Sequence, residues 1–145
     1  MKEVLEIIPI ALYLLVGVIS LIMAYKSMFS NKLLPFHEKA AGIPWDKIDR
    51  SLQCVLITLM RVSGPGFLVI AALLIISPIV NYFAPHAFLH YAVPIISAFY
   101  CMGLFLVNYS LYKRTKAPTP WKGSLYVALI ILAGIVISTI VESCK

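Results

Sequence analysis

The chain has 145 residues, of which 61% are hydrophobic and 12% are charged, and its formal net charge at pH 7 is +6. A soluble domain has about 45–50% apolar and about 25% charged residues, so this composition leaves too little polar surface to cover a soluble core. It excludes an ordinary soluble domain. It predicts a single all-α domain over residues 1–145, an integral membrane four-helix bundle.

The first predicted span covers residues 7–25, "IIPIALYLLVGVISLIMAY", which contain no charged side chain. A spanning helix needs about 20 mostly apolar residues, and this segment has that length. The apolar run exceeds the ~7–15 residues of a signal-peptide core, and no cleavage site of small residues follows it. We therefore expect a retained helix rather than a removed signal.

An amphipathic segment follows over residues 47–63. Arg50 and Arg61 are eleven residues apart, which brings them within about 20° of each other around a helix. The opposite side is mostly apolar, with Leu52, Val55, Leu56, Leu59 and Met60. This pattern predicts an interfacial helix on the inner membrane surface, with Arg61 at the level of the headgroups, where its long stem snorkels.

The motif Gly64-Pro65-Gly66 lies between this segment and the second predicted span, residues 65–83. Because glycine and proline disfavour an uninterrupted helix, we expect a bend here. The alternative is one long kinked helix over residues 49–80. It would measure about 48 Å and exceed the ~30 Å hydrocarbon core. In that alternative Arg61 lies deeper in the membrane and becomes a candidate functional residue.

The third and fourth predicted spans cover residues 91–112 and 123–141. On the third, Ser97, Cys101 and Asn108 fall on one helical face, at offsets of four and eleven residues. Such a face usually packs against neighbouring helices, where small and polar side chains make close contacts, and a ligand channel is the other interpretation. The candidate ligand or lipid contacts are therefore Arg50, Arg61, Ser97, Cys101 and Asn108.

Two histidines lie between the second and third predicted spans. His86 and His90 are four residues apart, the spacing of two metal ligands on one face of a helix. The general-base glutamate of a zinc helix is missing, so an interfacial loop without metal is the preferred interpretation. We expect no metal and no other cofactor, with His86 and His90 as weak metal candidates.

Lysine and arginine are concentrated in two loops. The first contains Lys26, Lys32, Lys39, Lys47 and Arg50, and the second contains Lys113, Arg114, Lys116 and Lys122. Because positively charged loops are retained in the cytoplasm, we expect both termini outside, in a bacterial cytoplasmic (inner) membrane. Contact with anionic lipid explains the positive net charge, so membrane lipid is the expected partner and nucleic acid is not.

Three segments resemble recurrent elements of small bacterial four-span membrane proteins with no assigned function: "MRVSGPGFL", "PFHEKAAGIPWDKID" and "TPWKGSL". The resemblance extends over nearly the whole chain and implies the same four-span plan. Size and plan are also similar to the membrane-bound glutathione and eicosanoid enzymes, which carry an Arg-Asn-Glu pattern at the start of the second span. Residues 49–56 contain no asparagine or glutamate, so glutathione chemistry is not expected.

Two functional hypotheses follow. The first is a non-enzymatic bundle that binds a partner, a lipid or a small apolar ligand, as a homo-oligomer or within a larger membrane complex. The second is a small membrane enzyme that acts on a lipophilic substrate at the cytoplasmic interface, using His37, Glu38, Arg50 and Arg61. An enzyme should bring these side chains together in one pocket.

Overall fold

The computed structural model describes residues 2–84 and 87–143, and the regular structure within these ranges is helical. In chain order the elements are α1 (Lys2–Phe29), α2 (Pro35–Ala41), the 3-10 helix η1 (Trp45–Lys47), α3 (Arg50–Phe83), α4 (Ala87–Thr115) and α5 (Trp121–Ser143). The predicted all-α bundle is confirmed.

Four of the helices, α1, α3, α4 and α5, are long and apolar enough to cross a membrane. Each contains one of the four predicted spans. Their outer faces carry large exposed apolar side chains: Val69 is 56% exposed, Phe99 76% and Val107 68%. Large contiguous apolar surfaces are rare on soluble monomers, whereas lipid chains solvate them. The chain is therefore a membrane protein.

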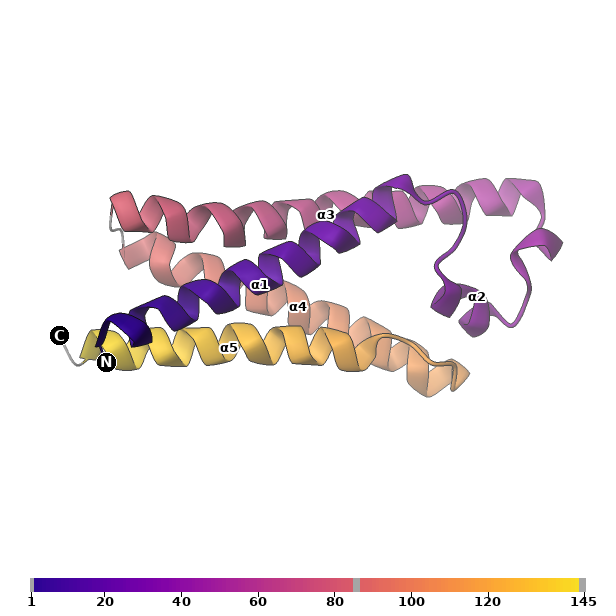
Figure 1. The fold of residues 1–145 in the computed structure, drawn as a ribbon. Helices are drawn as coiled ribbons and strands as arrows, with labels where there is room; N and C mark the ends of the chain where they lie inside the picture. Colours follow the sequence, from indigo (N-terminus) through magenta and orange to yellow (C-terminus); the bar gives the residue numbers. More distant parts are fainter. Residues whose placement is uncertain (1, 85–86, 144–145) are drawn as a thin grey trace.

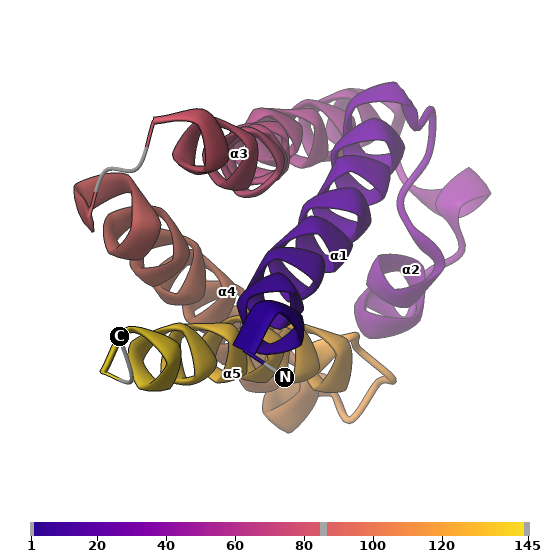
Figure 2. The same ribbon diagram turned by 60° about the vertical axis from the view of Figure 1, so that its left-hand side comes forward.

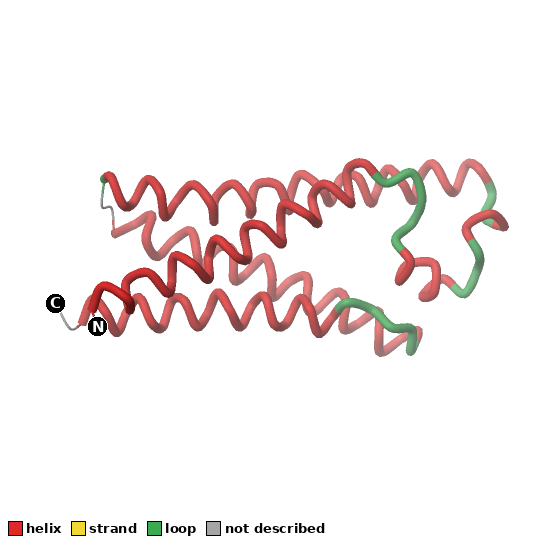
Figure 3. The backbone as a smooth tube through the Cα atoms, in the orientation of Figure 1, coloured by secondary structure: helices red, strands yellow, loops and turns green. Residues whose placement is uncertain are grey.

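The long helices form two closely packed pairs, α1 with α3 and α4 with α5, and α1 also contacts α5. α1 begins beside α5 and finishes beside α3, so it crosses the bundle diagonally (Figure 1, Figure 2). We call the end where α1 begins and α5 finishes the terminal end, and the opposite end, with segments 30–49 and 116–120, the basic end. At the basic end, where most of the loops lie (Figure 3), the ribbons of the two pairs diverge and α2 lies between them.

The interior of the bundle is built from side chains of all four long helices. The buried cluster comprises Tyr13, Val16, Ile70, Leu74, Val93, Cys101, Ala128 and Ile131. Because lipid chains are as apolar as this cluster, helix association in a bilayer depends on close van der Waals packing rather than on the hydrophobic effect. Ala71, Ser97 and Ala128 are 0% exposed, and their small size lets the helix backbones approach one another.

α3 runs without interruption from Arg50 to Phe83, through the Gly64-Pro65-Gly66 motif. The predicted division into an interfacial helix at 47–63 and a separate span at 65–83 is therefore wrong, and the alternative of one continuous helix is confirmed in its continuity. Proline inside a helix removes one backbone hydrogen bond, a loss that neighbouring groups in a membrane bundle compensate. With 34 residues, α3 measures about 51 Å, so about 20 Å of it exceeds the ~30 Å hydrocarbon core.

The two glycines of this motif are packing positions. A Cβ atom at Gly64 would lie 2.3 Å from Cγ of Met28 and 3.4 Å from the backbone oxygen of Ala24, both on α1. A Cβ atom at Gly66 would lie 2.8 Å from the hydroxyl of Tyr100 on α4. The motif therefore lets α1 and α4 approach α3 closely, instead of marking the predicted bend.

α2 is not among the predicted elements, although the chain carries its start and stop signals. Pro35 occupies the first turn, where its missing N–H leaves no hydrogen bond unmade. Gly42 ends the helix in the left-handed conformation, with φ of 67°, and its N–H donates to the carbonyl of Glu38 at 3.1 Å. This is the usual helix stop that favours glycine, because a side chain at positive φ is strained.

We expect Gly64→Ala to destabilise the bundle by about 1–3 kcal/mol, the range typical of an overpacked interior. Gly103→Ala is the matched control, because a Cβ atom at Gly103 meets nothing within 4 Å and alanine favours a helix by up to about 1 kcal/mol. Thermal unfolding of the detergent-solubilised variants, followed by circular dichroism, measures both effects. Equal unfolding midpoints for the two variants would contradict the packing role of Gly64.

Candidate functional site

A cavity of about 930 Å³ lies at the basic end, between the two helix pairs and α2. Its walls are mainly apolar and include Leu33, Met60, Phe67, Leu104, Val127 and Ile130. No lysine, arginine, aspartate or glutamate occurs among its described lining residues. Small-molecule sites typically measure about 300–1,000 Å³ and combine apolar walls with a few polar groups. This cavity, called the basic-end cavity below, is therefore the candidate functional site.

Polar groups of α4 and α5 meet in the wall of this cavity. Nδ2 of Asn108 donates to Oγ of Ser124 at 3.1 Å. The hydroxyl of Thr119 donates to the backbone oxygen of Asn108 at 2.9 Å. These bonds connect the end of α4 to the beginning of α5, so the side chain of Asn108 supports the wall of the basic-end cavity as well as lining it.

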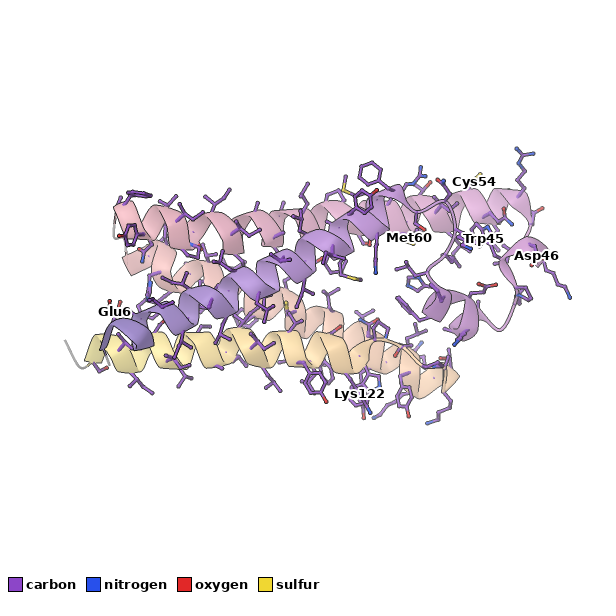
Figure 4. All side chains as sticks on the ribbon, viewed as in Figure 1. Glu6, Trp45, Asp46, Cys54, Met60 and Lys122 are labelled. Carbon is purple, nitrogen blue, oxygen red and sulfur yellow. The ribbon has the colours of Figure 1, made fainter. Side chains whose placement is uncertain are left out.

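α2 forms the part of the wall that faces the loops, through Phe36, His37, Ala40 and Ala41. Side-chain hydrogen bonds hold the segment between α2 and α3, where Figure 4 shows Trp45 and Asp46. The backbone N–H of Trp45 donates to Oε1 of Glu38 at 2.9 Å. Nε2 of Gln53 donates to the backbone oxygen of Trp45 at 2.7 Å. The short helix is therefore connected through this segment to the start of α3.

His37 is the one ionisable imidazole among the described residues that line the basic-end cavity. Its Nδ1 atom is buried and has no hydrogen-bond partner among the described residues. Its ring lies next to that of Phe36, with 3.9 Å between the centroids. Burial disfavours the charged imidazolium and lowers the pKa of His37 from its ordinary value of 6.5. At neutral pH the cavity wall therefore carries a neutral imidazole with one unpaired ring nitrogen.

The two predicted arginine contacts lie outside the basic-end cavity. Arg61 is exposed, and its Nη2 donates to Oδ1 of Asn31 at 3.2 Å and to the backbone oxygen of Ser30 at 3.4 Å. Arg50 is exposed at the first residue of α3. Arg61 therefore caps the chain after α1 rather than lying against the Ser97–Asn108 face, and its depth in the membrane stays a prediction.

The three polar residues predicted on one face of the third span differ in their surroundings. Cys101 and Asn108 line the basic-end cavity, whereas Ser97 does not. Ser97 is 0% exposed, and its hydroxyl has no hydrogen-bond partner among the described residues. The packing interpretation of this face is confirmed for Ser97 and Cys101, which are buried against other helices.

The residues named in the enzyme hypothesis do not converge on this cavity. Of His37, Glu38, Arg50 and Arg61, only His37 lines it. The carboxylate of Glu38 accepts the backbone N–H of Trp45 instead. Tyr100, which is not among the predicted contacts, also lines the basic-end cavity from α4 and packs edge-on against Phe67, with 5.8 Å between the ring centroids. No local pattern marks Tyr100, because the contact joins two helices that are distant in the sequence.

The weak metal candidates are only partly within the described chain. His86 lies outside the described residues. Nδ1 of His90 is 3.0 Å from Nδ2 of Asn81, and its Nε2 is 3.6 Å from Oε1 of Glu142. Within residues 2–84 and 87–143, no group of three or more His, Cys, Asp or Glu side chains is arranged to hold a metal ion. The polar neighbours of His90 are therefore the amide of Asn81 and the carboxylate of Glu142.

Aromatic rings and lysine side chains lie next to one another at the basic end of α4 and α5. The ring of Tyr109 lies 5.5 Å from that of Trp121 and 5.6 Å from that of Phe105. Nζ of Lys113 lies 5.1 Å from the Tyr109 centroid, and Nζ of Lys122 lies 5.6 Å from the Trp121 centroid. Aromatic rings combined with lysines are typical of the membrane–water interface.

Comparison with known proteins gives no assignment, because the chain matches no protein-family model, no curated protein and no solved structure. The resemblance of the three sequence segments to small four-span bacterial proteins stays a prediction. Function is therefore inferred from the cavity walls and from the charges around them.

We expect acid to weaken the docking of α2 through His37. Because the folded pKa of His37 lies below 6.5, its contribution to stability is present above pH 6.5 and is lost as the pH falls through the lowered value. Thermal unfolding of the wild type and of His37→Phe between pH 7.5 and pH 5 measures this. The midpoint of the wild type should fall more than that of the variant, since the other histidines are common to both. If the unfolding midpoints of the two proteins fell equally between pH 7.5 and pH 5, burial of His37 would not contribute to the pH dependence of stability.

Proposed function

We propose that the protein is a non-enzymatic membrane protein that binds a membrane lipid by taking an acyl chain into the basic-end cavity. The observation that carries the proposal is the chemical character of the cavity. It has a volume of about 930 Å³, mainly apolar walls and no charged side chain among the described lining residues. A hydrocarbon chain fits such a wall, because the chain has no polar group of its own that would lose a hydrogen-bond partner on burial.

Charges outside the cavity support a lipid rather than a wholly apolar ligand. Lys32 and Lys39 are exposed on either side of the start of α2, and Arg61 is exposed on α3. Anionic lipid headgroups are attracted to basic side chains close to the membrane surface. The neutral His37 imidazole adds one hydrogen-bonding group inside the wall. The enzyme hypothesis lacks comparable support, because only His37 of its four residues lines the cavity.

We further propose that the protein resides in the bacterial cytoplasmic membrane, with the basic end in the cytoplasm and both termini outside. The support is the concentration of lysine and arginine in the loops at that end. The pairs of aromatic rings and lysines on α4 and α5 also favour a headgroup layer at this level. The projecting first part of α3 then extends into the cytoplasm. A homo-oligomer or a larger complex stays a prediction from the sequence.

We expect Gly123→Trp to displace the bound lipid. Gly123 lines the basic-end cavity, and a Cβ atom there meets nothing within 4 Å, so a large side chain can enter without a backbone clash. Gly103→Trp is the matched control, because Gly103 also has open space around it but does not line the cavity. Native mass spectrometry of protein extracted into lipid nanodiscs should detect a lipid adduct in the wild type and the control. Occupancy in Gly123→Trp should be about tenfold lower, a change of about 1.4 kcal/mol. Wild-type occupancy in Gly123→Trp would disprove the cavity as the lipid site.

The topology can be tested by labelling single cysteines. Asp46→Cys and Ala84→Cys place a thiol at exposed positions of the basic and terminal ends, in a background where Cys54, Cys101 and Cys144 are replaced by serine. An impermeant maleimide added to intact spheroplasts should label position 84 and leave position 46 unmodified. Permeabilised spheroplasts, in which both positions should react, are the control. The opposite pattern in intact spheroplasts would mean that both termini are cytoplasmic.

A further inference from the structure

A second cavity, of about 310 Å³, lies at the terminal end between α1, α3, α4 and α5. Glu6 on α1 and Glu142 on α5 line it with carboxylates, while Asn81 and His90 add an amide and an imidazole. No lysine or arginine occurs among its described lining residues. Figure 4 shows Glu6 at this end, far from the labelled residues of the basic end. This terminal cavity therefore presents mainly hydrogen-bond acceptors and negative charge.

Two deeply buried hydroxyl groups belong to the same cavity. Tyr13 and Ser138 are each 4% exposed and both line it. The two hydroxyls are neighbours, but neither makes a hydrogen bond of good geometry to a described residue. Buried hydroxyls are normally paired, because leaving one without a partner is unfavourable. Both groups are therefore available to a molecule bound in the cavity.

The Glu142 carboxylate has one hydrogen-bond donor and one imidazole as neighbours. Its Oε2 accepts a hydrogen bond from the Tyr91 hydroxyl, and its Oε1 lies 3.6 Å from Nε2 of His90. Nδ1 of His90 lies 3.0 Å from the amide nitrogen of Asn81. Because an amide nitrogen donates, Nδ1 is the acceptor of this contact, and Nε2 is the ring nitrogen that faces Glu142. The carboxylate is therefore oriented before any ligand arrives.

We propose that the terminal cavity binds a small organic ammonium ion, whose N–H groups donate to Glu142 and to the hydroxyls of Tyr13 and Ser138. A primary ammonium group has three donors and no acceptor, which matches a site made of a carboxylate and two unpaired hydroxyl oxygens. The rings of Tyr13 and Tyr82 in the lining add aromatic faces that attract a cation. An anion is disfavoured, because Glu6 and Glu142 would repel it.

The rest of the lining indicates that the cation carries a hydrocarbon body. It consists largely of apolar side chains, including Pro9, Ile10, Pro78, Leu89, Pro94 and Val141. A bare metal ion would use several carboxylate, thiolate or imidazole ligands, and no such group of three exists among the described residues. The volume, about 310 Å³, is at the lower limit of the usual ~300–1,000 Å³ range, so the amine is small.

The test compares 2-phenylethylammonium with 2-phenylethanol, which has the same body and no charge. Isothermal titration calorimetry on the protein in nanodiscs, corrected with empty nanodiscs, should show about tenfold tighter binding of the ammonium ion at pH 7.5. Glu142→Gln should remove this difference. Asp46→Asn, which changes the charge equally at an exposed position of the basic end, should leave it unchanged.

Tyr13→Phe and Ser138→Ala keep the proposal testable if Glu142→Gln fails to fold. Each removes only an unpaired hydroxyl, so each should weaken ammonium binding several-fold while leaving the unfolding midpoint of the free protein unchanged or higher. Equal binding of the ammonium ion and the alcohol, or no binding of either, would overturn the proposal and leave an ordered water as the occupant. Unchanged ammonium affinity in Tyr13→Phe and Ser138→Ala would overturn it as well.

Discussion

The close contact of α1 with two different helices, one at each end of the bundle, is the constraint on which the other features depend. At the terminal end a Cβ atom on Gly134 of α5 would lie 2.6 Å from the Tyr13 ring. At the basic end a Cβ atom on Gly64 of α3 would lie 2.3 Å from Cγ of Met28. At both contacts the absence of a Cβ atom permits the close approach of α1. The two helix pairs consequently diverge at the basic end, where α2 and the large cavity lie between them.

The two cavities differ in the chemistry of their walls, and the bilayer explains the difference. The basic-end cavity has no charged side chain among its described lining residues, and the cations of that end are exposed on the helices and loops around it. The terminal cavity includes two carboxylates, each within two turns of a helix terminus. Charged groups are costly in the hydrocarbon core and inexpensive near its surfaces. An apolar ligand at one end and a cationic ligand at the other are therefore compatible with the same bundle.

The candidate site was partly predictable. The spacing of Cys101 and Asn108 indicated a common face, and both line the basic-end cavity. The same spacing did not distinguish Ser97, which is buried away from that cavity, because periodicity defines a face but not the neighbour opposite each residue. The sequence singles out His37 only as a neighbour of Glu38. Its place in the wall depends on how α2 lies between the two helix pairs, which no local pattern encodes.

The sequence by itself determined the membrane environment, the four spans and the all-α class, because these follow from composition and from the length of each apolar run. The start and stop of α2 were also present in Pro35 and Gly42, as local signals that act within one helical turn. Only the tertiary structure decided that α3 continues through Gly64-Pro65-Gly66. Local propensity disfavours a helix there, and close contacts from Ala24, Met28 and Tyr100 outweigh it. The convergence of Tyr13, His90, Ser138 and Glu142 on one cavity was likewise decided by packing, because these residues come from three helices whose mutual orientation depends on long-range contacts.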